Sequence, residues 1–166
     1  MIRTKQLSKE QALQKLRHYC AYQERCHAEV KEKLYSFGLH KQEVEESITQ
    51  LIEENYLNEE RFARQFAGGK FRMKQWGRNK IKEALKQKRV SDYCIRKALQ
   101  EIDEQQYQET LEKLAIKKWR SIRGQGVNRY VRSAKTTAWL MQKGYETDAI
   151  RRVVRGLAAR ESSLSE

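Results

Sequence analysis

One pattern of apolar residues occurs three times in this chain, and this repetition limits its fold more than any other feature. The first copy runs from Val30 to Leu51, and the residues 51 positions after its apolar residues are again apolar, from Ile81 to Ile102. A third copy, 106 residues after the first, matches its last five positions, from Leu140 to Leu157. Because self-similarity at a fixed spacing is typical of repeat proteins, we expect tandem copies of one small unit. The first copy consists of Val30, Leu34, Leu39, Val44, Ile48 and Leu51.

Each copy has the spacing of two short amphipathic helices that are joined by a tight turn. In the first copy, Val30 and Leu34 lie one helical turn apart, and Val44, Ile48 and Leu51 mark the apolar face of a second helix. The repeated pattern therefore predicts a helical hairpin in every copy.

The turn between the two helices contains a glycine in two of the three copies. Gly38 and Gly144 occupy matching positions, where a residue in the left-handed conformation normally ends a helix. The second copy has Arg89 at this position. We therefore expect a positive φ angle at Arg89, at a cost of roughly 1 kcal/mol.

A further helical stretch precedes each hairpin, and cap residues mark where several helices begin. Ser8 and Gln11 form a capping-box pattern, and Asn58 is a candidate N-cap. Ser91-Asp92 and Thr147-Asp148 follow the turns of the second and third copies as cap signals. The sequence thus predicts an all-α protein of three tandem three-helix repeats that form an elongated, curved array. The expected repeats are residues 1–57, 58–103 and 104–166.

The composition favours helix and an intracellular protein. Proline is absent and there are eight glycines, so turn signals for a sheet are few. No apolar run is long enough to span a bilayer, and the first residues lack the apolar stretch of a secretory signal. The three cysteines, Cys20, Cys26 and Cys94, do not make a disulfide framework. We expect a cytoplasmic protein, monomeric and not attached to a membrane.

Catalytic and metal-binding motifs are missing from the pattern of residues. The stretch GGK at 68–70 is not a phosphate loop, because position 64 is arginine and Phe71 follows the lysine. His18, Cys20, Cys26 and His27 point in scattered directions on a helix and have no C-x-x-C spacing. We expect no enzyme activity, no cofactor and no metal site.

Positive charge is unevenly distributed along the chain. Residues 1–57 contain nine basic and nine acidic side chains, whereas residues 58–103 contain thirteen basic and six acidic ones. Residues 104–166 contain thirteen basic and seven acidic ones. Such an excess indicates nucleic acid, an anionic membrane or an acidic protein surface as the partner.

The basic charge is densest in residues 70–89, which hold nine basic residues and a single acid, Glu83. If residues 79–88 are helical, Ile81 and Leu85 face the core, and Lys82 and Lys86 lie on another face. Like charges at this spacing destabilise a helix by a few tenths of a kcal/mol, which favours a function for them. A solvated surface remains the alternative.

The tryptophan within this segment, Trp76, has two interpretations. A tryptophan beside a glycine at the start of a helix most often packs over the end of a bundle, and stacking on a nucleic-acid base is the alternative. We favour packing. The further aromatic candidates for the core are Phe62, Phe66, Trp119 and Trp139.

Two stretches resemble the signature region of the RecX family of bacterial recombinase regulators: YLNEERFARQF (56–66) and KQWGRNKIKEALKQKRV (74–90). The preceding stretch HAEVKEKLYSFGL (27–39) is also similar to the family. The resemblance covers residues 20–103, and beyond them mainly the apolar pattern persists. Two positions depart from the family pattern, since Asn79 stands where proline is expected and Arg89 where glycine is usual.

This resemblance implies a protein that binds the RecA recombinase filament on single-stranded DNA and mostly inhibits ATP hydrolysis and strand exchange. The implied setting is homologous recombination, DNA repair and the SOS response. The expected partners are the filament and single-stranded DNA, with non-specific duplex binding left open. We expect the binding surface to consist of Arg72, Lys74, Arg78, Lys80, Lys82, Lys86, Lys88, Arg151, Arg152 and Arg155.

A transcription regulator of the helix-turn-helix type is the alternative, because a three-helix unit suits that fold. Against it, the last helices of the first two copies, residues 40–51 and 91–102, are acidic or mixed in charge, and the positive charge of residues 70–89 lies on the middle helix. Membrane attachment is less favoured, because the basic helices lack a broad aromatic and leucine face. A sequence-specific regulator would prefer one duplex by orders of magnitude, whereas a backbone binder would show steep salt dependence.

Overall fold

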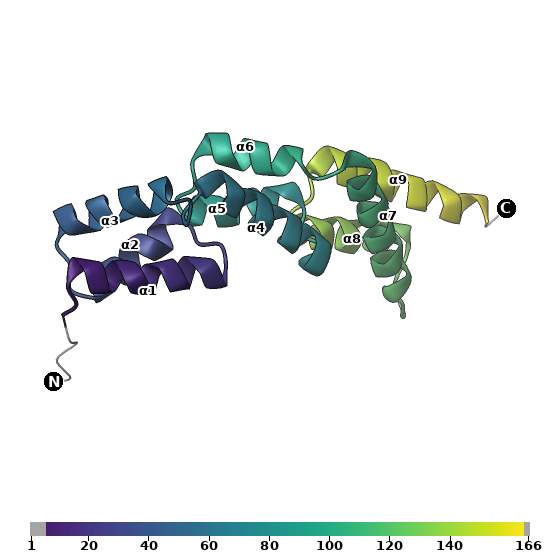
Figure 1. Ribbon diagram of the computed structural model, residues 1–166. Coiled ribbons are helices and arrows are strands. Elements are labelled where there is room, and N and C mark those ends of the chain that lie inside the picture. Colours follow the sequence, from purple (N-terminus) through teal and green to yellow (C-terminus); the bar gives the residue numbers. More distant parts are fainter. Residues whose placement is uncertain (1–5, 165–166) are drawn as a thin grey trace. The chain divides into compact units, whose positions relative to one another are not determined.

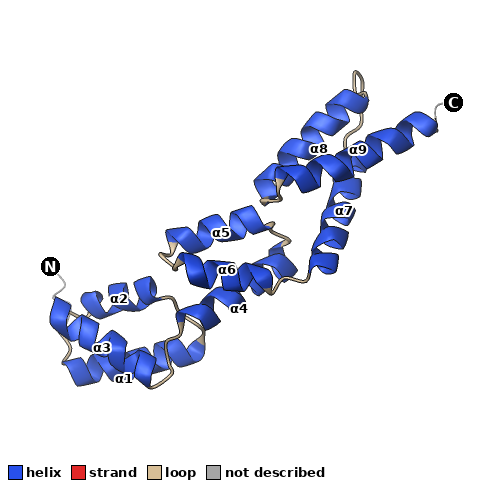
Figure 2. Ribbon diagram, turned by 90° about the horizontal axis from the view of Figure 1, so that it is seen from above, coloured by secondary structure: helices blue, strands red, loops and turns tan. Residues whose placement is uncertain are grey.

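The computed structural model describes residues 6–164, and within this range the chain forms nine helices and no strand (Figures 1 and 2). The all-α prediction is therefore confirmed. The helices are α1 (Lys9–Tyr22), α2 (His27–Ser36), α3 (Lys41–Glu53), α4 (Glu59–Lys74), α5 (Arg78–Gln87), α6 (Asp92–Gln100), α7 (Glu104–Ser121), α8 (Arg129–Lys143) and α9 (Thr147–Ser163).

Three of the predicted N-caps accept a hydrogen bond from the amide of the third helical residue. The distances from the side-chain oxygen to that nitrogen are 3.2 Å for Ser8, 2.9 Å for Asn58 and 3.3 Å for Ser91. The prediction for the third copy is wrong by one residue, because α9 already begins at Thr147 and Glu146 is its cap. The Glu146 side chain makes no cap hydrogen bond, because its carboxylate instead accepts a hydrogen bond from the phenol of Tyr107.

The turns within the three hairpins have the expected backbone conformation. The φ angles are 85° at Gly38, 60° at Arg89 and 96° at Gly144, so the prediction of a left-handed Arg89 is confirmed. Asn55 and Gln75, which follow α3 and α4, also have positive φ angles, of 64° and 56°. Neither position was expected from the sequence, because no glycine marks it.

The repeated apolar positions form the core. Val30, Leu34, Ile81, Leu85 and Leu140 are all fully buried. Among the aromatic candidates the outcome is divided: Phe62 and Trp119 are buried, whereas Phe66 and Trp139 are only partly buried. The period of the apolar residues thus correctly indicated which helix faces point inward.

The chain divides into two compact units. Unit 1 consists of Met1–Phe66 and Ala84–Ala98, and unit 2 consists of Ala67–Glu83 and Leu99–Glu166. In unit 1 the helices α1, α2 and α3 pack on one another, and in unit 2 the helices α7, α8 and α9 do so. The border between the units runs through α4, α5 and α6, which are the helices of the second predicted repeat. The repeat boundaries and the elongated shape stay predictions.

The cysteines of unit 1 are buried and free. Cys20, Cys26 and Cys94 have at most 8% of their surface exposed. Burial raises the pKa of the Cys20 thiol to about 11, so this side chain packs as a small apolar group. Over residues 6–164, no helix has the length and apolar character needed to cross a membrane. The same range contains no group of three His, Cys, Asp or Glu side chains placed to hold a metal ion.

Unit 2 contains a close backbone contact between two turns. The amide of Gly77 donates to the carbonyl oxygen of Lys143 at 2.7 Å, and the amide of Asn79 donates to that of Gly144 at 2.8 Å. A Cβ atom on Gly77 would lie 2.3 Å from the carbonyl carbon of Gly144. Because no side chain fits between them, the two glycines allow the α4–α5 turn to lie directly on the α8–α9 turn.

Candidate polyanion-binding surface

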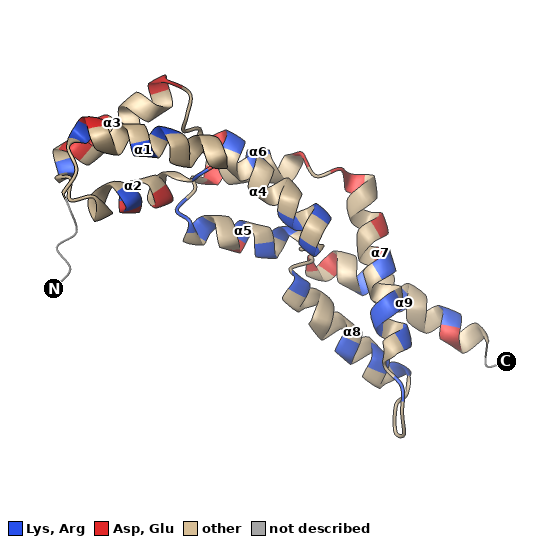
Figure 3. Cartoon of the chain, turned by 60° about the horizontal axis from the view of Figure 1, so that its bottom comes forward, with Lys and Arg blue, Asp and Glu red and all other residues tan. Residues whose placement is uncertain are grey.

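Most of the cations predicted for the binding surface belong to unit 2, and only Lys86 and Lys88 belong to unit 1. Figure 3 shows basic residues on α4, α5, α8 and α9. The structure separates these cations into two kinds. Some are neutralised by acidic side chains of the protein, and others face solvent without an ion-pair partner; we call the second kind bare cations.

Arg78 belongs to the first kind, because it is built into the core of unit 2. Its guanidinium lies 3.8 Å from the centre of the Tyr107 ring, 2.7 Å from a Glu104 carboxylate oxygen and 3.5 Å from one of Glu146. Hydrogen bonds from Gln108 and Arg78 lower the pKa of Glu104. Arg78 therefore fixes the start of α5 against α7 and α9, and its charge is already compensated.

Tyr107 is the centre of this contact. Its fully buried ring packs against the rings of Phe71 and Tyr145, with centroid distances of 5.7 Å and 5.1 Å. The phenol oxygen accepts a hydrogen bond from the amide of Arg78 at 3.0 Å and donates one to the Glu146 carboxylate. Burial and the bond to Glu146 raise the pKa of Tyr107, so the phenol keeps the proton that it donates.

The cations of α5 differ from one another. Lys82 and Lys86 are exposed and make no ion pair with any described residue. Lys88, in contrast, donates to a carboxylate oxygen of Glu29 at 3.0 Å, and this hydrogen bond raises the pKa of Lys88. The basic row read from the sequence therefore contains both bare cations and a neutralised one.

The end of α4 presents two further bare cations. Arg72 and Lys74 are exposed, and neither forms an ion pair within residues 6–164. The carbonyl oxygen of Lys74 accepts a hydrogen bond from the side chain of Lys143 at 3.0 Å. The ammonium group of Lys80 lies 4.6 Å from the centre of the Trp76 ring.

The third group of predicted cations lies on α9. This helix packs inward through Ile150 and Val154, and the arginines between and after them are exposed. Arg152 contributes to the lowered pKa of Glu104 by its charge alone. Arg160 lies 3.9 Å from a carboxylate oxygen of Glu112. The other three exposed arginines of α9 have no carboxylate within ion-pair distance in the part of the chain that the structure describes: Arg151, Arg152 and Arg155.

Sequence reasoning missed a feature around Trp139. The ammonium groups of Lys118 and Lys143 each lie 5.5 Å from the centre of this ring, which is only partly buried. Trp76 has a similar pair of lysines, Lys70 and Lys80. A shared spacing could have revealed the feature, since each tryptophan precedes a lysine by four residues.

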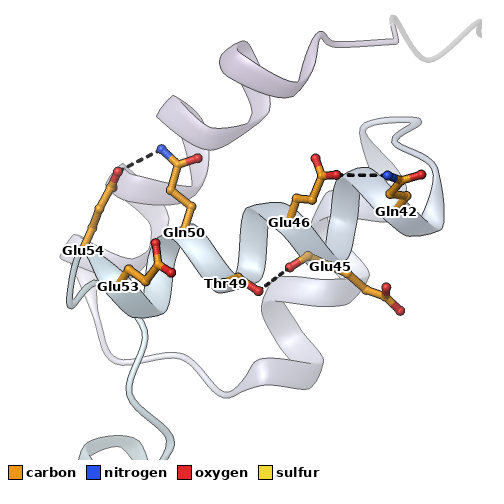
Figure 4. A pocket seen from close by; sticks show the side chains of 7 residues that line it. All are labelled: Gln42, Glu45, Glu46, Thr49, Gln50, Glu53 and Glu54. Atoms are coloured by element: carbon orange, nitrogen blue, oxygen red, sulfur yellow. Dashed lines mark hydrogen bonds between the residues drawn. The ribbon is translucent and has the colours of Figure 1, made fainter.

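Unit 1 presents a surface of the opposite charge on α3. A hollow there is lined mainly by acidic and amide side chains (Figure 4). Two of its carboxylates form ion pairs with side chains of α1: Lys9 lies 2.6 Å from Glu46, and Arg17 lies 2.9 Å from Glu54. The hollow does not suit an anionic ligand. Its lining residues are Gln42, Glu45, Glu46, Thr49, Gln50, Glu53 and Glu54.

Two family models match the chain. The model described as "RecX, second three-helix domain" matches residues 58–99, and the model described as "RecX, third three-helix domain" matches residues 104–154. Together the two matches cover more than half of the chain.

Regulatory proteins of two clostridia are similar in sequence. "Regulatory protein RecX" of Clostridium perfringens (strain 13 / Type A) is 35% identical over 133 residues, which are 80% of this chain and 62% of the relative. The protein with the same description from Clostridium botulinum (strain Eklund 17B / Type B) is 35% identical over 127 residues, which are 76% of this chain and 59% of the relative. The chain therefore spans about three-fifths of the length of these relatives.

Two crystal structures share the fold. RecX from Lactobacillus salivarius superimposes with a TM-score of 0.82 and 23% identity, over 90% of this chain and 96% of that protein. A second regulatory protein RecX gives a TM-score of 0.78 and 23% identity, over 87% of this chain and 70% of that protein. The helical architecture, the two matched domains and the similar sequences agree with one another, and the chain belongs to the RecX family.

Proposed function

We propose that this chain regulates the RecA recombinase by binding the filament that RecA forms on single-stranded DNA. In this proposal it mostly inhibits ATP hydrolysis and strand exchange, and so acts in recombination and DNA repair. It acts as a cytoplasmic monomer through binding alone, without a reaction of its own. The similarity to proteins described as "Regulatory protein RecX" supports a regulatory role.

The observation that carries the proposal is the row of bare arginines on α9. Arg151, Arg152 and Arg155 are exposed and make no ion pair with the described residues of the chain. Surface charges of this kind contribute little to folding, so their clustering is not explained by stability. The planar guanidinium group donates two parallel hydrogen bonds to a phosphate or a carboxylate. A filament of protein and DNA offers both kinds of anion.

Charge reversal on α9 tests the proposal. In the triple variant Arg151→Glu, Arg152→Glu and Arg155→Glu, we expect about a hundredfold more protein to be needed to inhibit ATP hydrolysis by RecA on single-stranded DNA, because several phosphate contacts are lost. Co-sedimentation with filaments measures binding directly. Circular dichroism should show unchanged helicity, since all three side chains are exposed.

The matched control places the same change of charge on unit 1. Lys15, Lys31 and Lys41 are exposed residues of α1, α2 and α3, and their replacement by glutamate should leave inhibition close to that of the unchanged protein. Equal loss in both triple variants would show that only net charge matters. Full inhibition by the α9 variant would contradict the proposed surface.

A second pair of substitutions tests α5. Lys82→Glu and Lys86→Glu together should abolish inhibition while helicity is retained, because both side chains are exposed and unpaired within the described residues. Retained inhibition would remove these two lysines from the surface. Arg78 is unsuitable for this test, since its replacement would remove the guanidinium that packs on the Tyr107 ring and pairs with the carboxylates of Glu104 and Glu146.

Salt and competitor DNA separate this function from that of a transcription regulator. A protein that holds the phosphate backbone loses affinity steeply as salt rises and shows no preferred sequence. A helix-turn-helix regulator would instead bind one duplex by orders of magnitude more tightly than random DNA. A strong preference for one duplex would contradict the proposal.

A further inference from the structure

Two tryptophans of unit 2 have the same surroundings. Trp76, in the turn between α4 and α5, has the ammonium groups of Lys70 and Lys80 at 4.9 Å and 4.6 Å from its ring centre. Trp139, on α8, has those of Lys118 and Lys143 at 5.5 Å each. Each ring therefore has two positive charges beside it.

Neither ring is a fully packed core residue. Trp76 and Trp139 are both partly exposed, whereas Trp119, the third tryptophan of the chain, has only 8% of its surface exposed. An ammonium group over an exposed ring contributes about 0.5–1 kcal/mol. A nucleic-acid base stacked on an aromatic side chain contributes roughly 1–3 kcal/mol. A base can therefore displace a lysine from such a ring, and the lysine can then pair with a phosphate.

Lys143 makes contacts beside both tryptophans. Its ammonium group lies over Trp139 and also donates to the carbonyl oxygen of Lys74, at the end of α4. Its own carbonyl oxygen accepts from the amide of Gly77, the residue that follows Trp76. The turn that contains Trp76 and the end of the helix that contains Trp139 thus meet at Lys143, within unit 2.

The composition of this surface decides which polyanion it fits. A single strand of nucleic acid presents alternating phosphates and exposed base faces, which match lysines and aromatic rings. A duplex hides its base faces in the stack, and an acidic peptide would pair with the lysines but leave the rings unused. The exposed Arg72 and Lys74 extend the positive charge along α4.

We propose that Trp76 and Trp139, with Lys70, Lys80, Lys118 and Lys143, form a stacking site for single-stranded nucleic acid. The inference rests on the proposed function and names the DNA strand as what this face of unit 2 contacts. It also revises the interpretation of Trp76 as a packing residue, because lysines border its partly exposed ring.

Tryptophan fluorescence tests the stacking site directly. The full chain is titrated with a fluorescein-labelled oligothymidylate, and the anisotropy of the label reports binding while tryptophan emission reports stacking. We expect the oligonucleotide to quench the emission of the unchanged protein. In the double variant Trp76→Phe and Trp139→Phe, only the buried Trp119 remains, and its emission should not change. Trp76→Ala and Trp139→Ala should each weaken binding about tenfold.

The outcomes distinguish this inference from the proposed function. If the oligonucleotide binds but emission and the affinity of the alanine variants are unchanged, the stacking site is wrong and the proposed function stands. If the oligonucleotide does not bind, the site is also wrong, and inhibition of RecA by the same protein sample decides the proposed function separately. Poly-glutamate that binds as tightly and quenches the same emission would overturn the assignment of the ligand.

Discussion

The hairpins α2–α3 of unit 1 and α8–α9 of unit 2 carry the same apolar pattern, but the three-helix groups that contain them, α1–α3 and α7–α9, differ in how their cations are used. In the first group, ion pairs join α1 to α3, with Lys9 bound to Glu46 and Arg17 bound to Glu54. In the second group, Arg132 is bound to Glu161 and Arg160 to Glu112, but Arg151, Arg152 and Arg155 of α9 make no ion pair with the described residues. The inward positions of the repeat therefore set the fold, while its outward positions are free to become neutral or strongly basic.

The corresponding turns of the two groups differ in a related way. Gly38 and Gly144 both have a positive φ angle, so each turn makes the same local demand. The nearest atom to a Cβ on Gly38 would be in the flexible side chain of Gln6, at 3.0 Å. A Cβ on Gly144 would lie 2.3 Å from the Cβ of Lys80 and 2.5 Å from its backbone nitrogen. The first turn therefore borders a flexible side chain and accepts a hydrogen bond from the amide of Leu7, whereas the second is docked directly on another backbone.

Alanine at these two glycines gives the largest expected effect. Gly38→Ala should lower the free energy of unfolding by about 1 kcal/mol, the cost of a side chain in the left-handed region. Gly144→Ala should lower it by about 3 kcal/mol, because the clash with Lys80 adds to that cost. Urea unfolding followed by circular dichroism measures both. Equal losses would mean that the α8–α9 turn is not docked as described.

Arginine at the matching turn of the second hairpin allows a test of intermediate size. Arg89→Gly should raise the free energy of unfolding by roughly 1 kcal/mol and raise the melting temperature, because glycine adopts the φ angle of 60° without strain. Arg89→Ala is the control, since it removes the charge but keeps a Cβ atom in the left-handed region. Unchanged or lower stability of the glycine variant would refute the interpretation.

The smallest expected effect concerns the ion pairs of unit 1. Hydrogen bonds from Arg17 and Gln50 lower the pKa of Glu54 from 4.5 to about 2. Because the folded-state pKa is the lower one, this contact stabilises the fold above pH 4.5 and stops doing so as the pH falls towards 2. At pH 7, Glu54→Gln should therefore have a lower free energy of unfolding than the unchanged protein. This difference should disappear as the pH falls towards 2, and urea unfolding at a series of pH values measures it.

The control for this prediction is Glu53→Gln, which removes the same charge from the neighbouring residue and leaves the contact between Arg17 and Glu54 intact. A pH dependence that changes equally in the two variants would show that net charge is responsible. In that case the ion pairs between α1 and α3 would not be a stabilising difference between the two groups of helices.

Features that depend on neighbouring residues were predictable from the sequence. The helices follow from apolar residues three and four positions apart, and the caps at Ser8, Asn58 and Ser91 follow from side chains that reach the amide of the third helical residue. The left-handed Arg89 follows from its alignment with two glycines. In each case the atoms that decide the conformation lie within a few residues, so their spacing along the chain is sufficient.

The sequence by itself thus determined the helices, their inward faces and the excess of positive charge. The tertiary structure decided which cations remain bare. Arg78 meets a carboxylate 26 residues away, at Glu104, and Lys88 meets one 59 residues away, at Glu29. Only the packing of the helices brings such groups together, because charges that are far apart attract one another too weakly through water and salt to determine a partner. The spacing of residues along the chain therefore does not reveal these ion pairs.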